Sequence, residues 1–245
     1  MLSPDVALVQ LINSTARAFA TNPPAYITYR ERTHVTSSIG RTQEINRLVK
    51  VRQADNFAVM QDLPEGSERT GQAFPIIPYF DPLGQRFTFG WFANLKRVDI
   101  TLQREPVGLW PVPALEDPGV NVVVPYASFW QPSYLPDSTP QQLHFRIVPT
   151  PAYGRGYYIY DVVQDAQTQL PSHIELRSTD SGDQIALDYK VLEGHWVIVR
   201  GTLTTAQRVG PLSFSVTAET DYEDMAFPAA PPDPRLAGTP SPAAS

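Results

Sequence analysis

The chain has no cysteine, so it has no thiol nucleophile and no thiolate metal ligand. The candidates for chemistry that we consider are its carboxylates and histidines. Asp161 and Asp165 lie close in sequence, and Glu31 could pair with another carboxylate, so the residues allow an acid–base pair of the glycosidase kind. Carboxylates are also common on strands and in turns, and Asp165 stands where a turn residue is expected. We therefore predict no catalytic residue and no enzyme activity, and keep a carboxylate hydrolase as the alternative.

Histidine spacing gives no metal motif. The four histidines lie far apart and never four residues from one another, so a metal site would need folding to bring two of them together. They are His34, His144, His173 and His195. The sequence also lacks a Gly-x-Ser-x-Gly elbow, a Walker loop and a Gly-x-Gly-x-x-Gly after a strand. We expect no bound metal and no cofactor.

Charge and composition exclude two further classes of protein. A formal net charge of −6 argues against a nucleic-acid partner, since binding to phosphates relies on clustered Lys and Arg. No run of residues approaches the roughly 18 apolar residues of a membrane span. Hydrophobic residues make up 42% of the chain, which is enough to form a core. The absence of cysteine fits the periplasm and equally the cytosol.

The elements that would hold any site begin with one helix. Ser3 followed by Pro4 and Asp5 is a helix start, and apolar residues then recur every three to four positions until Pro23. The segment "VALVQLINSTARAFA" lacks a preceding basic residue and has polar residues at its centre, so we interpret it as a mature helix. A signal peptide is expected to be absent from this sequence.

From Ala25 onward the sequence alternates between apolar and polar residues, which predicts antiparallel strands. The clearest are expected at 157–164, 172–179, 184–192, 195–205 and 211–222, separated by turn residues. Earlier strands are expected in "YITYRERTHVTSS", "RTQEINRLVKVRQ", "NFAVMQDL", "RFTFGWFANL", "KRVDITLQRE" and "QLHFRIV". We predict a single domain over 1–227 and a disordered Pro/Ala/Ser-rich tail over 228–245.

Proline and tryptophan mark the centre of the chain. Residues 74–151 hold 13 of the 25 prolines, so this part cannot be uninterrupted sheet. Residues 106–136 are expected to form long ordered loops, which are uncommon unless they have a function. One helix can cover only part of a broad sheet. We therefore expect some apolar surface to be left uncovered, as at a binding surface.

Residues 157–201 and the final strand carry a resemblance to a known family. "YIYDVV", "PSHIEL" after a turn, "QIALDY", "GHWVIV" and "FSVTAETDYEDMAF" follow one another as in the LolA and LolB lipoprotein carriers and their superfamily of envelope proteins. The similarity covers the first helix, the first strands and residues 157–227, whereas the Pro-rich centre departs from the pattern. It implies a mainly β (α+β) fold: a curved, unclosed antiparallel half-barrel with the helix and the long loops on its concave side.

The resemblance also implies a function. A LolA-like chain would be a monomeric carrier in the periplasm or cell envelope that holds acyl chains of a lipid or lipoprotein, with residues 106–136 as a rim or lid. The alternative is an interaction or sensory module of the same fold that binds an envelope protein. Aromatic content and strand phase select the candidate ligand-binding residues, which are Phe57, Val59, Phe89, Trp91, Trp110, Tyr158, Tyr160, Trp196, Ile198 and Phe214.

Overall fold

The structure is a computed structural model that describes most of the chain outside its N-terminal segment and its centre. The described residues are 3–4, 7, 24–55, 57–64, 66–72, 79–81, 86–89, 98–101, 130–151, 157–179, 182–209 and 212–238. Among them no helix is long and apolar enough to cross a membrane.

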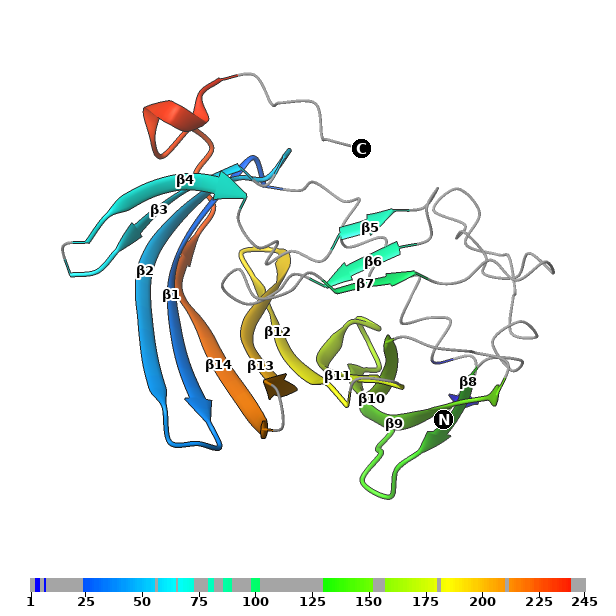
Figure 1. Ribbon diagram of the computed structural model, residues 1–245. Coiled ribbons are helices and arrows are strands. Elements are labelled where there is room, and N and C mark those ends of the chain that lie inside the picture. Colours follow the sequence, from blue (N-terminus) through cyan, green and yellow to red (C-terminus); the bar gives the residue numbers. More distant parts are fainter. Residues whose placement is uncertain are drawn as a thin grey trace.

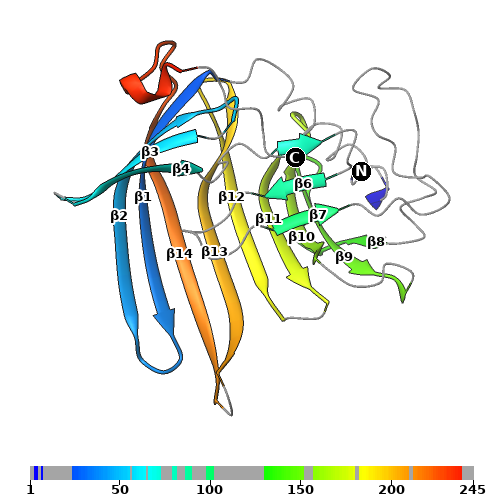
Figure 2. The same ribbon diagram turned by 45° about the horizontal axis from the view of Figure 1, so that its top comes forward.

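Eleven antiparallel strands form one curved sheet (Figures 1 and 2). Its spatial order is β4-β3-β2-β1-β14-β13-β12-β11-β10-β9-β8, so β4 and β8 each have one neighbour and the sheet is unclosed. The strands are β1 (Tyr26–Ser37), β2 (Thr42–Arg52), β3 (Phe57–Asp62), β4 (Glu68–Gln72), β8 (Trp130–Tyr134), β9 (Gln142–Pro149), β10 (Tyr157–Asp165), β11 (Pro171–Ser178), β12 (Gln184–Leu192), β13 (His195–Val209) and β14 (Leu212–Ala226). The predicted unclosed antiparallel sheet is confirmed.

A second, small sheet has the order β5-β6-β7 and consists of β5 (Tyr79–Asp81), β6 (Arg86–Phe89) and β7 (Val98–Thr101). Figures 1 and 2 both place it in the hollow of the large sheet, with β7 near β10. β6 and β7 agree with the strands predicted in "RFTFGWFANL" and "KRVDITLQRE". Most of the predicted loop 106–136 lies outside the described residues. Its end differs from the prediction, since β8 begins at Trp130.

Alternation along each strand gives the large sheet two different faces. On β1 the side chains of Ile27, Tyr29, Glu31 and Thr33 are buried, whereas Arg32 and His34 on the other face reach water. The cross-strand register continues one face across the sheet, from β1 to β8. One such row is Thr33, Thr220, Gly201, Leu187, Ile174, Val162, Phe145 and Tyr134.

The turns use the residues expected of them. Glu193 and Gly194 both have positive φ, which suits the two-residue connection between β12 and β13. The Asp165 carboxylate accepts hydrogen bonds from the backbone N–H groups of Gln167 and Thr168 and from the Thr168 hydroxyl. Asp165 is therefore the turn residue that its position predicted.

Only Ser3, Pro4 and Ala7 represent the predicted N-terminal helix. Pro4 and Ala7 are helical, and the Ala7 N–H donates to the Ser3 carbonyl at 3.0 Å. The remainder of that helix lies outside the described residues and stays a prediction. Ala7 is fully buried and belongs to the same hydrophobic cluster as the strands of the large sheet.

The first part of the expected disordered tail lies against the large sheet. Residues 234–236 form the short 3-10 helix η2 (Pro234–Leu236), which packs on β3 and buries Leu236 completely. The Asp233 carboxylate lies 3.5 Å from Lys50 Nζ. Arg52 donates from Nη1 to the carbonyls of Leu236 and Gly238. A buried leucine and charged contacts thus place residues 233–238 on the sheet.

Candidate functional site

The face of the large sheet that is turned to its hollow is apolar over most of its width. We call this the apolar face. Its buried side chains form one cluster that extends from β3 to β9. They include Ile27, Tyr29, Val49, Val51, Ala58, Met60, Ala218, Leu203, Ile198, Trp196, Ile185, Leu187, Tyr189, Ile174, Leu176, Val162, Leu143, Phe145 and Ile147. These side chains are buried, so the expected uncovered apolar area is not found among them.

The predicted ligand-binding residues whose side chains the structure describes lie on both faces of the large sheet. Trp196 and Ile198 are buried on the apolar face, and the alternation of β14 places half-buried Phe214 on the same face. Phe57 and Val59 share the opposite face with Lys50. Phe89 and Tyr158 are described by their backbone alone, and Trp91 and Trp110 lie outside the described residues.

Tyr160 lies on the opposite face because of a bulge. The register of β10 and β11 shifts between Ile159 and Asp161, so simple alternation assigns the wrong side to Tyr160. Its ring instead lies between two guanidinium groups, with Arg177 Cζ 3.4 Å and Arg146 Cζ 4.7 Å from the ring centroid. A cation–π contact of this kind holds an aromatic ring at a charged surface.

Trp196 is fixed within the apolar face. Its ring stacks on Tyr189 with centroids 4.3 Å apart, and its Nε1–H donates to the Pro171 carbonyl at 2.9 Å. Burial raises the pKa of the Tyr189 hydroxyl well above its usual value, and that hydroxyl has no hydrogen-bond partner. The aromatic part of the face therefore contains a polar group without a partner.

A second set of polar side chains interrupts the apolar face on β1, β2 and β14. We call Tyr29, Glu31, Thr33, Arg47, Thr220 and Tyr222 the Glu31–Arg47 cluster. Register places Glu31 opposite both Arg47 and Tyr222, and Thr33 opposite Thr220. All six residues are buried. Asp62 of β3, which is opposite Arg47, has a side chain 41% exposed, so the cluster adjoins water on the β3 side.

Arg47 is held loosely within this cluster. Its Nη1 lies 3.8 Å from a Glu31 oxygen and its Nε 3.5 Å from an Asp62 oxygen, both longer than an ordinary hydrogen bond. The Thr33 hydroxyl bonds to that of Thr220 at 2.8 Å and donates to Glu31 at 3.4 Å. The buried Arg47 Nε and Tyr29 hydroxyl have no hydrogen-bond partner.

Burial controls the ionisation of the cluster. Loss of solvent raises the pKa of the Glu31 carboxyl, although Arg47 and the Thr33 hydroxyl oppose that effect. Burial also raises the pKa of Tyr29 and Tyr222 well above the usual value, and the Glu31 charge adds to it. Because Glu31 follows Ile27 and Tyr29 at alternate positions, the sequence held the signal for a buried carboxylate, which our reasoning missed.

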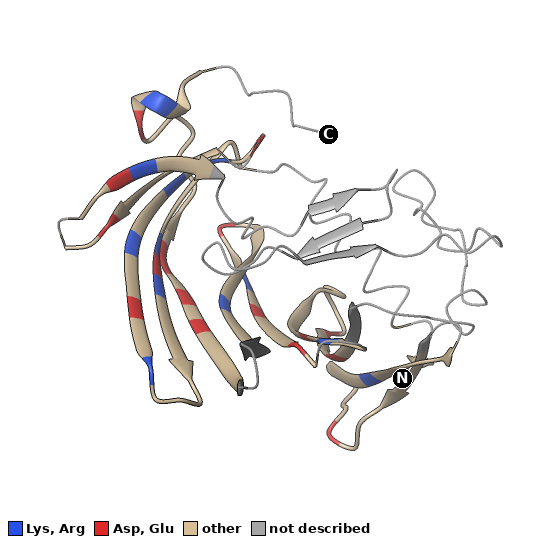
Figure 3. Ribbon diagram, viewed as in Figure 1, with Lys and Arg blue, Asp and Glu red and all other residues tan. Residues whose placement is uncertain are grey.

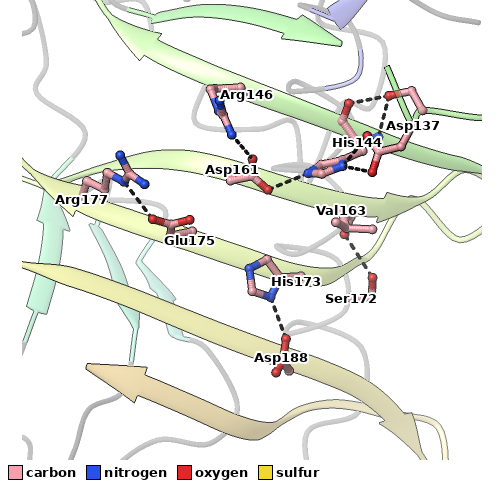
Figure 4. Close-up of polar contacts among 11 residues, drawn as sticks. Asp137, His144, Arg146, Asp161, Val163, Ser172, His173, Glu175, Arg177 and Asp188 are labelled. Carbon is pink, nitrogen blue, oxygen red and sulfur yellow. Dashed lines mark hydrogen bonds and ion pairs between the residues drawn. The ribbon is translucent and has the colours of Figure 1, made fainter. Parts of the chain in front are cut away.

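The opposite face of β9–β12 carries paired charges (Figure 4). His144 lies between Asp137, at 2.7 Å, and Asp161, at 2.8 Å. His173 is 2.6 Å from Asp188 on the neighbouring strand β12. Asp161 also lies 3.4 Å from Arg146, so it belongs to this surface network while Asp165 belongs to a turn. The predicted acid–base alternative therefore finds no shared site for these two carboxylates.

Hydrogen bonding sets the pKa of both histidines. Burial favours neutral His144, but the bonds to Asp137 and Asp161 outweigh it and raise its pKa. The bond to Asp188 raises the pKa of His173. No group of three or more His, Asp or Glu side chains suited to a metal ion occurs in the part of the chain that the structure describes. Charged residues are not confined to β9–β12, since Figure 3 shows Lys, Arg, Asp and Glu spread along β1, β2 and β14.

No protein-family model matches the chain, and no curated protein matches it either. Solved structures that match include a LolA superfamily protein from Nitrosomonas europaea, 11% identical with a TM-score of 0.41, covering 92% of this chain and 94% of that one. A domain titled as an outer membrane lipoprotein-sorting protein, from Vibrio parahaemolyticus, is 11% identical with a TM-score of 0.44, covering 94% and 97%. A DUF1329 family protein from Desulfovibrio piger is 9% identical with a TM-score of 0.42, covering 92% and 94%.

These three matches cover more than nine tenths of each chain. Their identities of 9–11% and TM-scores of 0.41–0.44 are low, so we base the functional proposal on the residues of this chain.

Proposed function

We propose that this protein is a non-enzymatic carrier or binding protein of the cell envelope that holds acyl chains of a lipoprotein, or another hydrophobic ligand, against its apolar face. The observation that carries the proposal is the apolar face itself, which continues across a broad unclosed sheet from β3 to β9. Such a face binds acyl chains with little polar chemistry, because each methylene removed from water contributes about 0.8 kcal/mol.

The ligand must displace part of what covers the apolar face. Ile27, Phe145, Leu176 and Ile185 are fully buried, so their contacts with the chain have to be exchanged for contacts with the ligand. The net binding free energy is then the difference between the ligand's apolar contacts and the contacts of the chain that the ligand displaces. It is smaller than the free energy of transferring a free acyl chain out of water. The proposal keeps the predicted rim or lid at 106–136, and places the protein in the periplasm or cell envelope as a monomer.

A fluorescent fatty acid tests the proposal. The purified chain should bind it saturably at one molecule per chain, with unchanged near-UV circular dichroism, and unlabelled fatty acid should compete. Retained near-UV dichroism separates binding to a folded carrier from binding to a loosened state that exposes apolar surface. Binding without saturation, or binding that appears only with loss of the near-UV signal, would contradict the proposal.

A second candidate is an envelope interaction or sensory module of the same fold. The covered apolar face favours it, together with the paired charges of His144, Asp161, Arg146, His173 and Asp188 on the opposite face. A charged surface suits a protein partner better than an acyl chain. Absence of fatty-acid binding, combined with a defined complex in affinity purification, would favour this candidate.

A further inference from the structure

The Glu31–Arg47 cluster is an exception on the apolar face, because buried charges are costly unless they are well paired. Arg47 and Glu31 have side chains only 8% exposed, yet their nearest atoms are 3.8 Å apart. A buried pair with such geometry contributes less than apolar residues of similar volume would. The fold alone therefore gives little reason to place these two side chains here.

Two donors in the cluster point to a missing acceptor. The Tyr29 hydroxyl and the Arg47 Nε–H are both buried without a hydrogen bond, and the Asp62 oxygen near Arg47 Nε is 3.5 Å away. Buried polar groups in folded proteins are almost always paired, so each exception calls for an explanation. Both donors lie on the same face, two residues and one strand apart, beside the Glu31 carboxyl. An oxygen that accepts from both would satisfy the pair.

We propose that the Glu31–Arg47 cluster binds the carboxyl or ester oxygens at the polar end of an acyl-chain ligand; this inference rests on the carrier function proposed above. The ligand oxygen accepts from Tyr29 and Arg47, and the half-exposed Asp62 side marks where the polar end meets water. A carboxyl or ester end is favoured over an ammonium group, because its oxygen accepts from Tyr29 and Arg47, and the nearby Glu31 and Asp62 carboxylates favour the uncharged acid or ester over the anion.

The neighbouring part of the sheet suits the acyl chain. Thr220 of the cluster pairs with Gly201, and the row continues through Leu187, Ile174 and Val162 to β9. From β13 to β9 this row spans four strand spacings, or roughly 19 Å. One leaflet of a bilayer has a hydrocarbon thickness of about 15 Å, so the row is long enough for a membrane acyl chain.

Two probes separate recognition of the head group from recognition of the chain. The first is a fatty acid with a fluorophore at the end remote from its carboxyl group, and the second is diphenylhexatriene, which has no polar end. Tyr29→Phe removes only the unpartnered hydroxyl and should leave folding intact. Arg47→Met removes the guanidinium and keeps an apolar stem of similar length. Arg32→Met is the matched control, since Arg32 lies on the opposite face of β1 with a 56% exposed side chain.

Each cluster variant should weaken fatty-acid binding by about ten-fold, the loss expected for one hydrogen bond to a charged group, and leave diphenylhexatriene binding unchanged. Arg32→Met should change neither. Fatty-acid binding that is equal in wild type, Tyr29→Phe and Arg47→Met would overturn the head-group site alone and leave the carrier function standing. If wild type binds neither probe, the carrier function and the head-group site are both overturned. If Arg47→Met does not fold, Tyr29→Phe decides the question.

Discussion

Leu236→Ala is the substitution that best tests how the C-terminal segment is attached. Leu236 is the fully buried last residue of η2, which packs on β3; the contact of Asp233 with Lys50 places η2 on the face of the sheet that carries Val59. Truncating a fully buried leucine costs about 2–5 kcal/mol in a core that cannot collapse around the cavity. A segment at the end of the chain can instead detach locally, which limits the loss to the free energy of docking. We expect Leu236→Ala to lower the free energy of unfolding by about 2 kcal/mol, near the lower end of that range.

Polar contacts strengthen the docking that this substitution would weaken. Arg235 lies 2.6 Å from Glu68 on the edge strand β4 and 2.8 Å from Asp233. Because the side chains of Arg235 and Glu68 are both 42% exposed, their ion pair adds little to the free energy of docking. The apolar contact of Leu236 is therefore the dominant contribution, and alanine should release the segment even with these ion pairs intact.

Urea unfolding and hydrogen exchange measure the effect. Leu236→Ala should lower the free energy of unfolding by about 2 kcal/mol or, if docking is local, speed exchange of the β3 and β4 amides with a smaller global change. Val191→Ala is the matched control, because Val191 is 53% exposed and should change stability by less than about 0.5 kcal/mol. Equal stability and equal β3–β4 exchange in the two variants would refute the docking of residues 233–238.

Two further predictions concern groups outside this segment. His144 has a raised pKa in the folded chain. It therefore contributes stability that is fully present below the unfolded histidine pKa of about 6.5 and is lost as the pH rises through the folded pKa. Between pH 5.5 and 8.5 the urea midpoint should fall more in wild type than in His144→Asn. Parallel curves would contradict this. Trp196→Phe removes the 2.9 Å hydrogen bond to the Pro171 carbonyl. It should lower the free energy of unfolding in urea by about 1–3 kcal/mol. An unchanged urea midpoint would show that this hydrogen bond does not stabilise the fold.

The central strands could be predicted because burial on one face imposes alternation. β10 to β14 were expected within a few residues of their observed positions, and the turns between them contain residues such as Gly194 and Asp165 that have local reasons to be there. β4 and β8 were missed because they are edge strands. "ERTGQ" is polar and "WQPSY" contains Pro132, and both features are tolerated at an edge where half of the backbone groups need no partner.

The candidate site could be predicted only in part. Strand phase identified Trp196 and Ile198 on the apolar face, but a bulge reversed the phase at Tyr160, and no local pattern announces a bulge. Val59 is buried on the opposite face of β3, the strand on which η2 packs from about 175 residues later in the chain, and periodicity cannot anticipate packing over that distance. The sequence analysis considered Glu31 only as one member of an alternative acid–base pair, although its alternation with Ile27 and Tyr29 places it among buried residues.

Competition by fatty acids of increasing length tests most directly whether the apolar face holds acyl chains. With the fluorescent fatty acid as reporter, affinity should rise with each added methylene by up to about four-fold, the factor that corresponds to 0.8 kcal/mol, until the chain exceeds the row from β13 to β9. An affinity that does not change with chain length, or an absence of competition at every length, would show that the apolar face is only a core and that the carrier account is wrong.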